Sequence, residues 1–173
     1  MSKVVAKGAQ MTPEQALARL AALCSRGEQA ESDLRNKLQR WGIDPAEADS
    51  IIQHLKDNNF LNEERYAHAF VRDKARFNGW GRVKIAHALR QKQVSSSVIL
   101  QALDEELDAE SSCDTLLHLL QGKARTLAGR EPRLARTALL RFAASRGFET
   151  DLCYRCVDEV CRTMNIPDDE QAD

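Results

Sequence analysis

The sequence has few aromatic residues, little net charge and no alternating runs of β-branched residues. Phe, Trp and Tyr make up only 5% of the chain, whereas Ala, Leu, Arg, Glu and Gln are plentiful. Strands favour β-branched and aromatic residues, so this composition argues against a β-sheet protein and favours helices. A net charge of −1 gives the chain as a whole no strong electrostatic attraction to nucleic acid or to membranes. Any such attraction must come from local clusters of charge.

Long apolar segments are also missing. Residues 1–10 contain lysines but no continuous apolar run of the length that a signal peptide needs, and no stretch is long enough to span a membrane. Five cysteines, an odd number, favour reduced thiols over a disulfide framework when no export signal is expected. We therefore expect a cytoplasmic protein that does not act at a membrane. With 43% hydrophobic residues, it can still bury a substantial core.

No set of residues has the spacing of a catalytic or metal site. The four histidines are scattered one per expected helix: His54, His68, His87 and His118. Cys153 and Cys156 form a Cys-x-x-Cys pair, but neither a second pair nor histidines follow it, as a zinc site would need. With Val157 and Val160 these cysteines have the spacing of a buried helix face, so we interpret them as buried thiols.

The segment Gly79-Trp80-Gly81 lacks the preceding strand and the Lys-Ser/Thr of a phosphate-binding loop, so it is interpreted as a turn. Trp41 and Trp80 lie at helix edges, where packing against the neighbouring repeat is favoured over stacking on nucleic-acid bases. We expect no catalytic residue, no metal, no cofactor and no small-molecule substrate. The sequence therefore predicts a binding protein rather than an enzyme.

Apolar periodicity and helix-capping residues predict nine helices. Thr12-Pro13 and Asp44-Pro45 have the residues of helix starts, and Gly42 and Asn78-Gly79 those of helix ends. The expected helices cover 12–27, 28–41, 45–55, 62–77, 80–93, 95–107, 109–128, 132–146 and 151–161.

These helices form a repeating pattern. Apolar positions that include Leu34, Leu38 and Ile43 correspond to Ile85, Leu89 and Val94 at a shift of 51 positions, and a shift of 54 carries most of the pattern onward. We predict an all-α fold of three tandem three-helix repeats in an elongated, curved body, with a single compact bundle as the alternative. The predicted divisions are 1–11 as a disordered N-terminus, 12–60, 61–108 and 109–163 as the repeats, and 164–173 as an acidic disordered tail.

Basic residues concentrate in the middle repeat. Residues 61–93 include eight basic and three acidic residues, which gives this segment a net charge of +5. They are the candidate partner-binding residues Arg65, Arg72, Lys74, Arg76, Arg82, Lys84, Arg90 and Lys92. On a helix Arg65, Arg72 and Arg76 fall within roughly 40° of one another, away from an apolar face that carries Tyr66, Phe70 and Phe77. A solvated helix face is the alternative interpretation.

A second basic block follows an acidic stretch. Residues 94–122 contain six acids and no Lys or Arg, and Lys123, Arg125, Arg130, Arg133, Arg136, Arg141 and Arg146 come next. This alternation suits an extended surface that meets a patterned partner, and it suits ion pairs between adjacent repeats equally well. The sequence leaves both possibilities open.

Two segments of the middle repeat carry a resemblance to a known family. Residues 60–72 (FLNEERYAHAFVR) and 79–92 (GWGRVKIAHALRQK) are similar to the signature of the RecX family. The likeness covers about 12–161 and is weakest in the third repeat. The family usually has Asp where Asn62 stands, which also caps helices, and Gly where Gln93 precedes Val94. Gln93 is less favourable than glycine in a left-handed turn, so the sequence does not fix the geometry of that loop.

The resemblance implies a partner and a function. It implies a negative regulator that binds the RecA recombinase or its filament with DNA, and inhibits strand exchange, ATP hydrolysis and coprotease activity. Such a protein would modulate DNA repair by homologous recombination and the SOS response. We expect a monomer, leave weak direct binding to DNA open, and assign Arg72, Arg76, Arg82 and Lys84 to the filament contact. A helical DNA-binding module and a scaffold for another protein are the alternatives.

Overall fold

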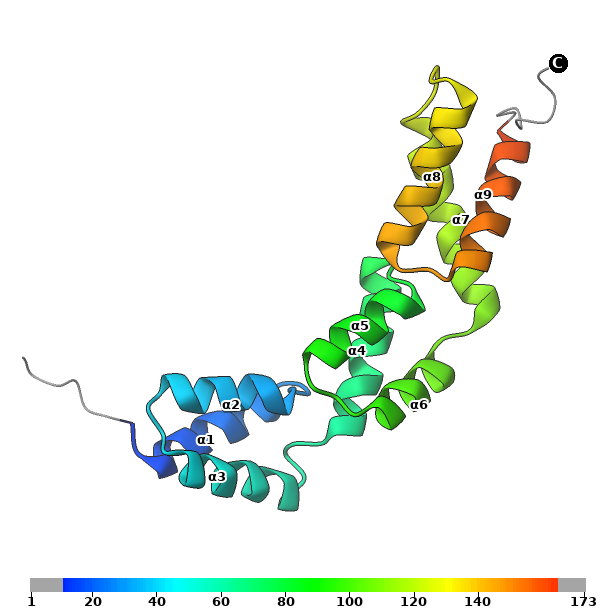
Figure 1. Cartoon of the computed structure of the whole chain (residues 1–173). Coiled ribbons are helices and arrows are strands. Elements are labelled where there is room, and N and C mark those ends of the chain that lie inside the picture. The colour runs from blue at the N-terminus through cyan, green and yellow to red at the C-terminus, as the bar shows by residue number, and fades with distance from the viewer. Residues whose placement is uncertain (1–10, 165–173) are drawn as a thin grey trace, which may run out of the picture.

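The computed structural model describes residues 11–164, and within that range the fold is all-α, with nine helices and no strand. The helices follow one another as three groups of three along an elongated, bent body (Figure 1). No helix in this range is long and apolar enough to cross a membrane. The predicted disordered ends fall almost entirely on residues 1–10 and 165–173, outside the described range.

The first repeat contains α1 (Pro13–Cys24), α2 (Glu31–Arg40) and α3 (Pro45–Asp57). Thr12 and Gln15 form a reciprocal capping box at the start of α1, and the Asp44 carboxylate accepts a hydrogen bond from the Ala46 N–H. The core of this repeat is formed by side chains that are almost completely buried: Leu20, Leu34, Leu38, Ile52 and Leu55.

The second helix begins later than the sequence predicted. It was expected from residue 28, but α2 begins at Glu31, and Ala30 has an extended backbone. The Glu28 side chain is held by Arg65 of the next repeat, and Ala30 is buried in the core of that repeat. Contacts with the neighbouring repeat therefore keep the segment before α2 extended.

The second repeat contains α4 (Glu63–Asn78), α5 (Arg82–Gln91) and α6 (Ser96–Glu106). Asn62 caps α4 by accepting a hydrogen bond from the Arg65 N–H, and Gly79 ends the helix in the left-handed conformation. Gln93 also takes a left-handed conformation, with φ of 63°, where the family usually has glycine. The loop thus keeps its glycine-type shape at the cost of some backbone strain.

The third repeat contains α7 (Ala109–Arg125), α8 (Pro132–Arg146) and α9 (Thr150–Thr163). Its core combines leucines of α7 and α8 with Cys153, Cys156 and Val157 of α9. The two cysteines predicted as buried thiols are buried, at 4% and 1% exposure, and all five cysteines of the chain are free thiols.

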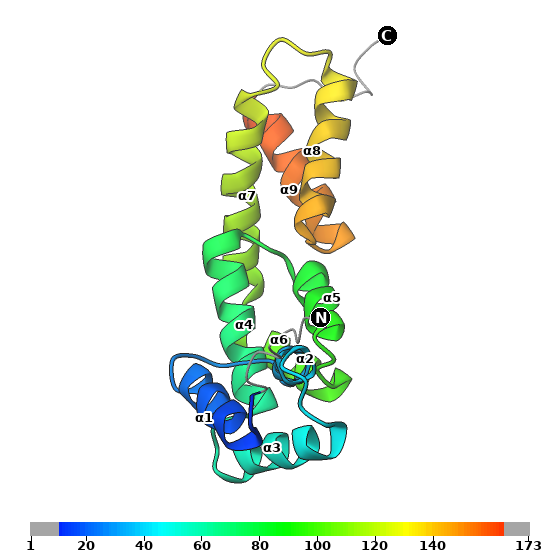
Figure 2. The same cartoon turned by 90° about the vertical axis from the view of Figure 1, so that its left-hand side faces the viewer.

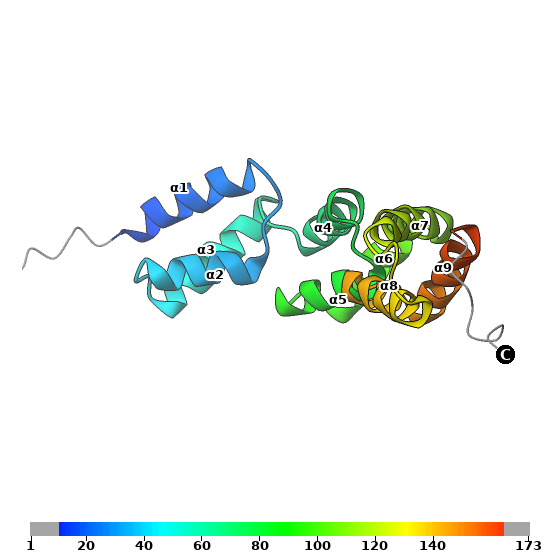
Figure 3. The same cartoon turned by 90° about the horizontal axis from the view of Figure 1, so that it is seen from above.

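Each repeat has its own apolar core, so the chain forms the predicted tandem repeats rather than the alternative, a single compact bundle. In Figure 1 the first repeat is turned away from the line of the other two, and Figure 2 shows α7 continuing upward from the end of α4. Seen from above, the third repeat partly overlaps the second, while the first projects to one side (Figure 3). Two junctions between repeats therefore set the curvature of the body.

Candidate partner-binding surface

The eight predicted basic residues do not form one surface, because two of them are used to join the first and second repeats. The Arg65 Nε donates to Glu28 at 2.7 Å, and its other nitrogens donate to the side chain and carbonyl of Asn59. The Lys92 ammonium contacts both carboxylate oxygens of Asp33 at 2.9 Å. These are the ion pairs between adjacent repeats that the sequence left open as an alternative.

Two lysines lie around one aromatic ring of the second repeat. The Lys74 ammonium is 5.1 Å and the Lys84 ammonium 4.7 Å from the centroid of the Trp80 ring. Lys84 also donates to the Ser145 carbonyl of the third repeat at 3.1 Å. Trp80 itself packs against the core of its own repeat, with both cations over its ring.

Arg82 forms an ion pair within its own repeat, with its Nη2 2.5 Å from the Asp104 carboxylate. Arg90 is exposed on α5, on a different helix from the α4 arginines. The remaining two predicted residues, Arg72 and Arg76, both point from α4 to solvent. Thus Arg72 and Arg76 form an exposed pair on α4, whereas most of the other predicted basic residues make contacts within the protein.

Arg72 is positioned by a small polar network. Its side chain is 60% exposed, and its Nη1 lies 3.1 Å from the Glu106 carboxylate at the end of α6. The same carboxylate oxygen is 2.8 Å from Nδ1 of His68, one turn before Arg72 on α4. Glu106 thus orients Arg72 without removing it from solvent.

Phe77 was predicted on the apolar face of its helix, and the structure shows that prediction to be wrong. Phe77 is 73% exposed, more than any other large apolar residue in the described range. The buried face of α4 ends at Val71, so the last turn of the helix extends beyond the core of its repeat. The Arg76 guanidinium lies 5.4 Å from the centroid of the Phe77 ring.

Surface clefts lie on both sides of Phe77. A cleft of about 650 Å³ is lined by Arg72, Arg76, Phe77, Trp80 and Leu107, together with the acids Glu106 and Asp108. A second, of about 550 Å³, is lined by Arg76, Phe77, His118 and Arg146. We call Arg72, Arg76 and Phe77, with these two clefts, the α4 surface. It offers an aromatic side chain and two guanidinium groups to a partner.

The second basic block is divided in the same way. The Arg136 Nη1 lies 2.6 Å from Asp158 of α9, and Arg146 donates to the Asn78 carbonyl of the second repeat. In contrast, Lys123, Arg130 and Arg141 line a surface cleft of about 510 Å³ between α7 and α8. Part of this block therefore faces solvent and part holds the third repeat in place.

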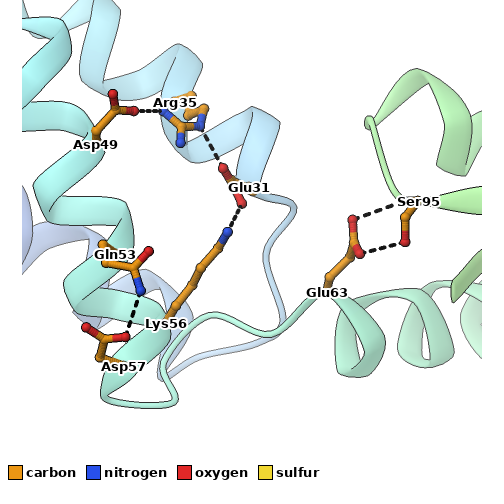
Figure 4. A network of polar contacts seen from close by, with 8 residues as sticks. All are labelled: Glu31, Arg35, Asp49, Gln53, Lys56, Asp57, Glu63 and Ser95. Carbon is orange, nitrogen blue, oxygen red and sulfur yellow. Dashed lines mark hydrogen bonds and ion pairs between the residues drawn. The ribbon is translucent and has the colours of Figure 1, made fainter.

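Carboxylates and hydroxyls near the first junction are held by local partners. Figure 4 shows Glu31 accepting from Arg35 and Lys56 within the first repeat, and Glu63 accepting from the N–H and hydroxyl of Ser95 within the second. Burial alone would raise the pKa of Glu31, but the hydrogen bonds from Lys56 and Arg35 outweigh it and lower the pKa. The Ser32 hydroxyl donates to the Lys92 carbonyl at 2.8 Å. Polar side chains thus dominate this junction.

Backbone groups dominate the second junction. The Gly81 N–H donates to the Arg146 carbonyl at 2.8 Å, and the Val83 N–H donates to the Gly147 carbonyl at 2.9 Å. A Cβ on Gly147 would lie 2.2 Å from the Cβ of Lys84, and one on Gly81 would lie 2.4 Å from the Gly147 carbonyl oxygen. The two loops can approach this closely only because both positions are glycine.

Comparison with known proteins identifies the family. The family model described as "RecX, second three-helix domain" matches residues 62–103. A "Regulatory protein RecX" from Halorhodospira halophila is 34% identical over 131 residues, which cover 75% of this chain and 78% of that protein. The chain belongs to the RecX family. A RecX from Clostridium perfringens (strain 13 / Type A) is also 34% identical, but the chain spans only 59% of its length.

Solved RecX structures share the fold. The "Crystal structure of regulatory protein RecX" gives a TM-score of 0.77 at 21% identity and covers 85% of this chain and 71% of that one. The "Crystal structure of RecX from Lactobacillus salivarius" gives 0.75 at 18% identity and covers 86% and 96% of the two chains. The predicted all-α repeat fold and the predicted family are therefore confirmed, and the RecX relatives are named as regulatory proteins.

Proposed function

We propose that this RecX-family chain is a negative regulator of the RecA recombinase. It binds RecA or its filament with DNA and lowers strand exchange, ATP hydrolysis and coprotease activity, and thereby modulates DNA repair and the SOS response. Membership of a family of regulatory proteins is the observation that carries this proposal. Five free thiols are consistent with action in the cytoplasm.

The α4 surface is the part of the chain best suited to the contact with RecA. Binding energy at protein interfaces concentrates in aromatic and arginine side chains, and Phe77 and two arginines lie together there. Guanidinium groups pair with carboxylates in fixed geometry, and the two adjacent clefts can receive side chains of a partner. Arg82 and Lys84, which we assigned to the filament contact from the sequence, have intramolecular partners that would have to be exchanged on binding.

The direct test is the rate of ATP hydrolysis by RecA on single-stranded DNA in the presence of this protein. We expect inhibition when the protein is well below equimolar with RecA, because one elongated molecule can contact several protomers of a filament. No inhibition at equimolar protein would exclude the proposed function.

The cleft lined by Lys123, Arg130 and Arg141 favours direct DNA binding as a second candidate function. A surface that neutralises phosphates releases counterions, so its affinity for naked DNA falls steeply with salt. Fluorescence anisotropy with labelled DNA over a range of salt concentrations tests this candidate. Affinity for naked DNA equal to that for the filament would favour it over regulation of RecA.

A further inference from the structure

Two thiols on neighbouring helices of the third repeat lie close together. The Sγ atoms of Cys113 on α7 and Cys156 on α9 are 3.5 Å apart. A disulfide bond has a sulfur–sulfur length of about 2.05 Å, so the two atoms need to close by only about 1.5 Å. The two helices already pack against each other along their lengths.

We propose that Cys113 and Cys156 are a modification site, a thiol pair that a peroxide oxidises to an intrachain disulfide between α7 and α9. The inference concerns the third repeat alone and does not depend on the function proposed above.

The two thiols have different access to an oxidant. Cys156 is 1% exposed within the third apolar core, and burial, followed by the neighbouring Cys113 thiol, raises its pKa to about 12. It therefore stays protonated at neutral pH and is a poor first nucleophile. Cys113 is partly exposed, and its neighbours Ser112 and Asp114 line surface clefts. An oxidant from solvent therefore reaches Cys113 first.

The reaction proceeds in two balanced steps. The Cys113 thiolate attacks one oxygen of hydrogen peroxide, which forms an S–O bond, breaks the O–O bond and releases hydroxide that is protonated to water. The Cys156 sulfur then attacks the Cys113 sulfenic acid, and the thiol proton leaves with the hydroxyl group as a second water. The two sulfurs lose two electrons, and the peroxide gains them.

Two of the other cysteines, Cys153 and Cys24, are less suited to this reaction. The Cys153 thiol donates to the Phe148 carbonyl at 3.5 Å, and Cys24 lies in the first repeat, in a different core. The Cys-x-x-Cys pair that stands out in the sequence is thus not the pair in contact, because Cys156 meets Cys113 from 43 positions away.

The test treats the reduced full-length chain with hydrogen peroxide, blocks the remaining thiols under denaturing conditions, and maps the linked peptides by mass spectrometry without reduction. We expect a link between Cys113 and Cys156, lost on adding dithiothreitol. Cys24→Ser and Cys153→Ser should keep the link, and Cys113→Ser and Cys156→Ser should abolish it, with circular dichroism reporting whether each variant stays helical. Because the link closes a loop of 43 residues, oxidation should raise the melting temperature by roughly 5–10 °C.

The mapping of the wild-type chain needs no variant and can overturn the proposal by itself. A link between Cys153 and Cys156, or full blocking of Cys156 after peroxide treatment, would each show that the proposed pair does not form.

Discussion

The two junctions between repeats are built from different groups, although both contain basic residues of the same segment. At the first, charged side chains bridge the gap, as in the pairs of Lys92 with Asp33 and Arg65 with Glu28. At the second, the N–H groups of Gly81 and Val83 donate to the carbonyls of Arg146 and Gly147, and both glycines are in contact with the opposite chain segment. A junction made of partly exposed ion pairs is weak and sensitive to salt. A junction made of close-packed backbone is stronger and does not depend on salt.

This difference assigns a role to each end of the molecule. We therefore expect the second and third repeats to form a fixed unit that carries the α4 surface, and the first repeat to be attached through contacts that salt weakens. The following predictions test that comparison.

The largest effect should come from filling the space at the second junction. In Gly147→Ala, the added Cβ meets Lys84 and the backbone has a φ of 80°, so we expect a loss of about 3 kcal/mol or more in the free energy of unfolding. Gly122→Ala is the matched control, because nothing lies within 4 Å of that Cβ inside α7, and it should stabilise by about 0.5–1 kcal/mol. Urea unfolding measures both, and equal effects would contradict the close packing described for this junction.

The first junction should respond to salt. In a double-mutant cycle with Lys92→Met and Asp33→Asn, we expect a coupling of at most about 1 kcal/mol at low salt, since both side chains are more than a third exposed. This coupling should approach zero near 1 M salt because exposed charges are screened. Hydrogen exchange of the Gly81 and Val83 amides at the second junction should change little under the same conditions. Loss of protection at those amides would remove the distinction between the junctions.

A smaller effect is expected at the loop before Val94. Gln93 has a left-handed backbone with φ of 63°, so Gln93→Gly should relieve strain and stabilise the chain by about 0.5–1 kcal/mol. Gln101→Gly, inside α6, should destabilise it by about the same amount because glycine is unfavourable within helices. If the strain at Gln93 is real, the two variants change the melting temperature in opposite directions.

The smallest effect is a pH dependence at Glu31. Since the folded-state pKa is lowered from 4.5, this carboxylate stabilises the fold above that pH, and the contribution is lost as pH falls through the lower folded-state value. Glu31 is about a third exposed, so the effect should be well below 1 kcal/mol. Stability curves of the wild type and Glu31→Gln should differ near neutral pH and converge in acid. A constant difference across that range would exclude the ion pairs with Lys56 and Arg35 as its source.

Features set by local sequence were predictable, and features set by contacts between distant segments were not. The caps at Thr12, Asp44 and Asn62 and the helix end at Gly79 were predicted because each depends on a few neighbouring residues. Helical geometry also predicted the exposure of Arg72 and Arg76 on α4, but not the pairing of Arg65 with Glu28.

The predictions failed where the outcome depends on segments that are distant in the sequence. Helical periodicity placed Phe77 on the apolar face, but it gives no information on where the covering helices end. The contact of Gly81 with Gly147 and that of Cys113 with Cys156 join residues from different helices, and no local signal marks either partner. The division of the basic residues into junction and exposed groups likewise required the positions of Glu28 and Asp33.

The central claim, that the α4 surface of this RecX-family chain binds the RecA filament, is tested most directly by one affinity measurement. The double variant Arg72→Glu/Arg76→Glu is compared with the matched control Arg26→Glu/Arg40→Glu, whose arginines are exposed on the first repeat. Binding to RecA filaments on single-stranded DNA should weaken at least about tenfold for the α4 variant, as expected for loss of two interface arginines. The control should bind like the wild type. Equal affinities of the two variants would contradict the account.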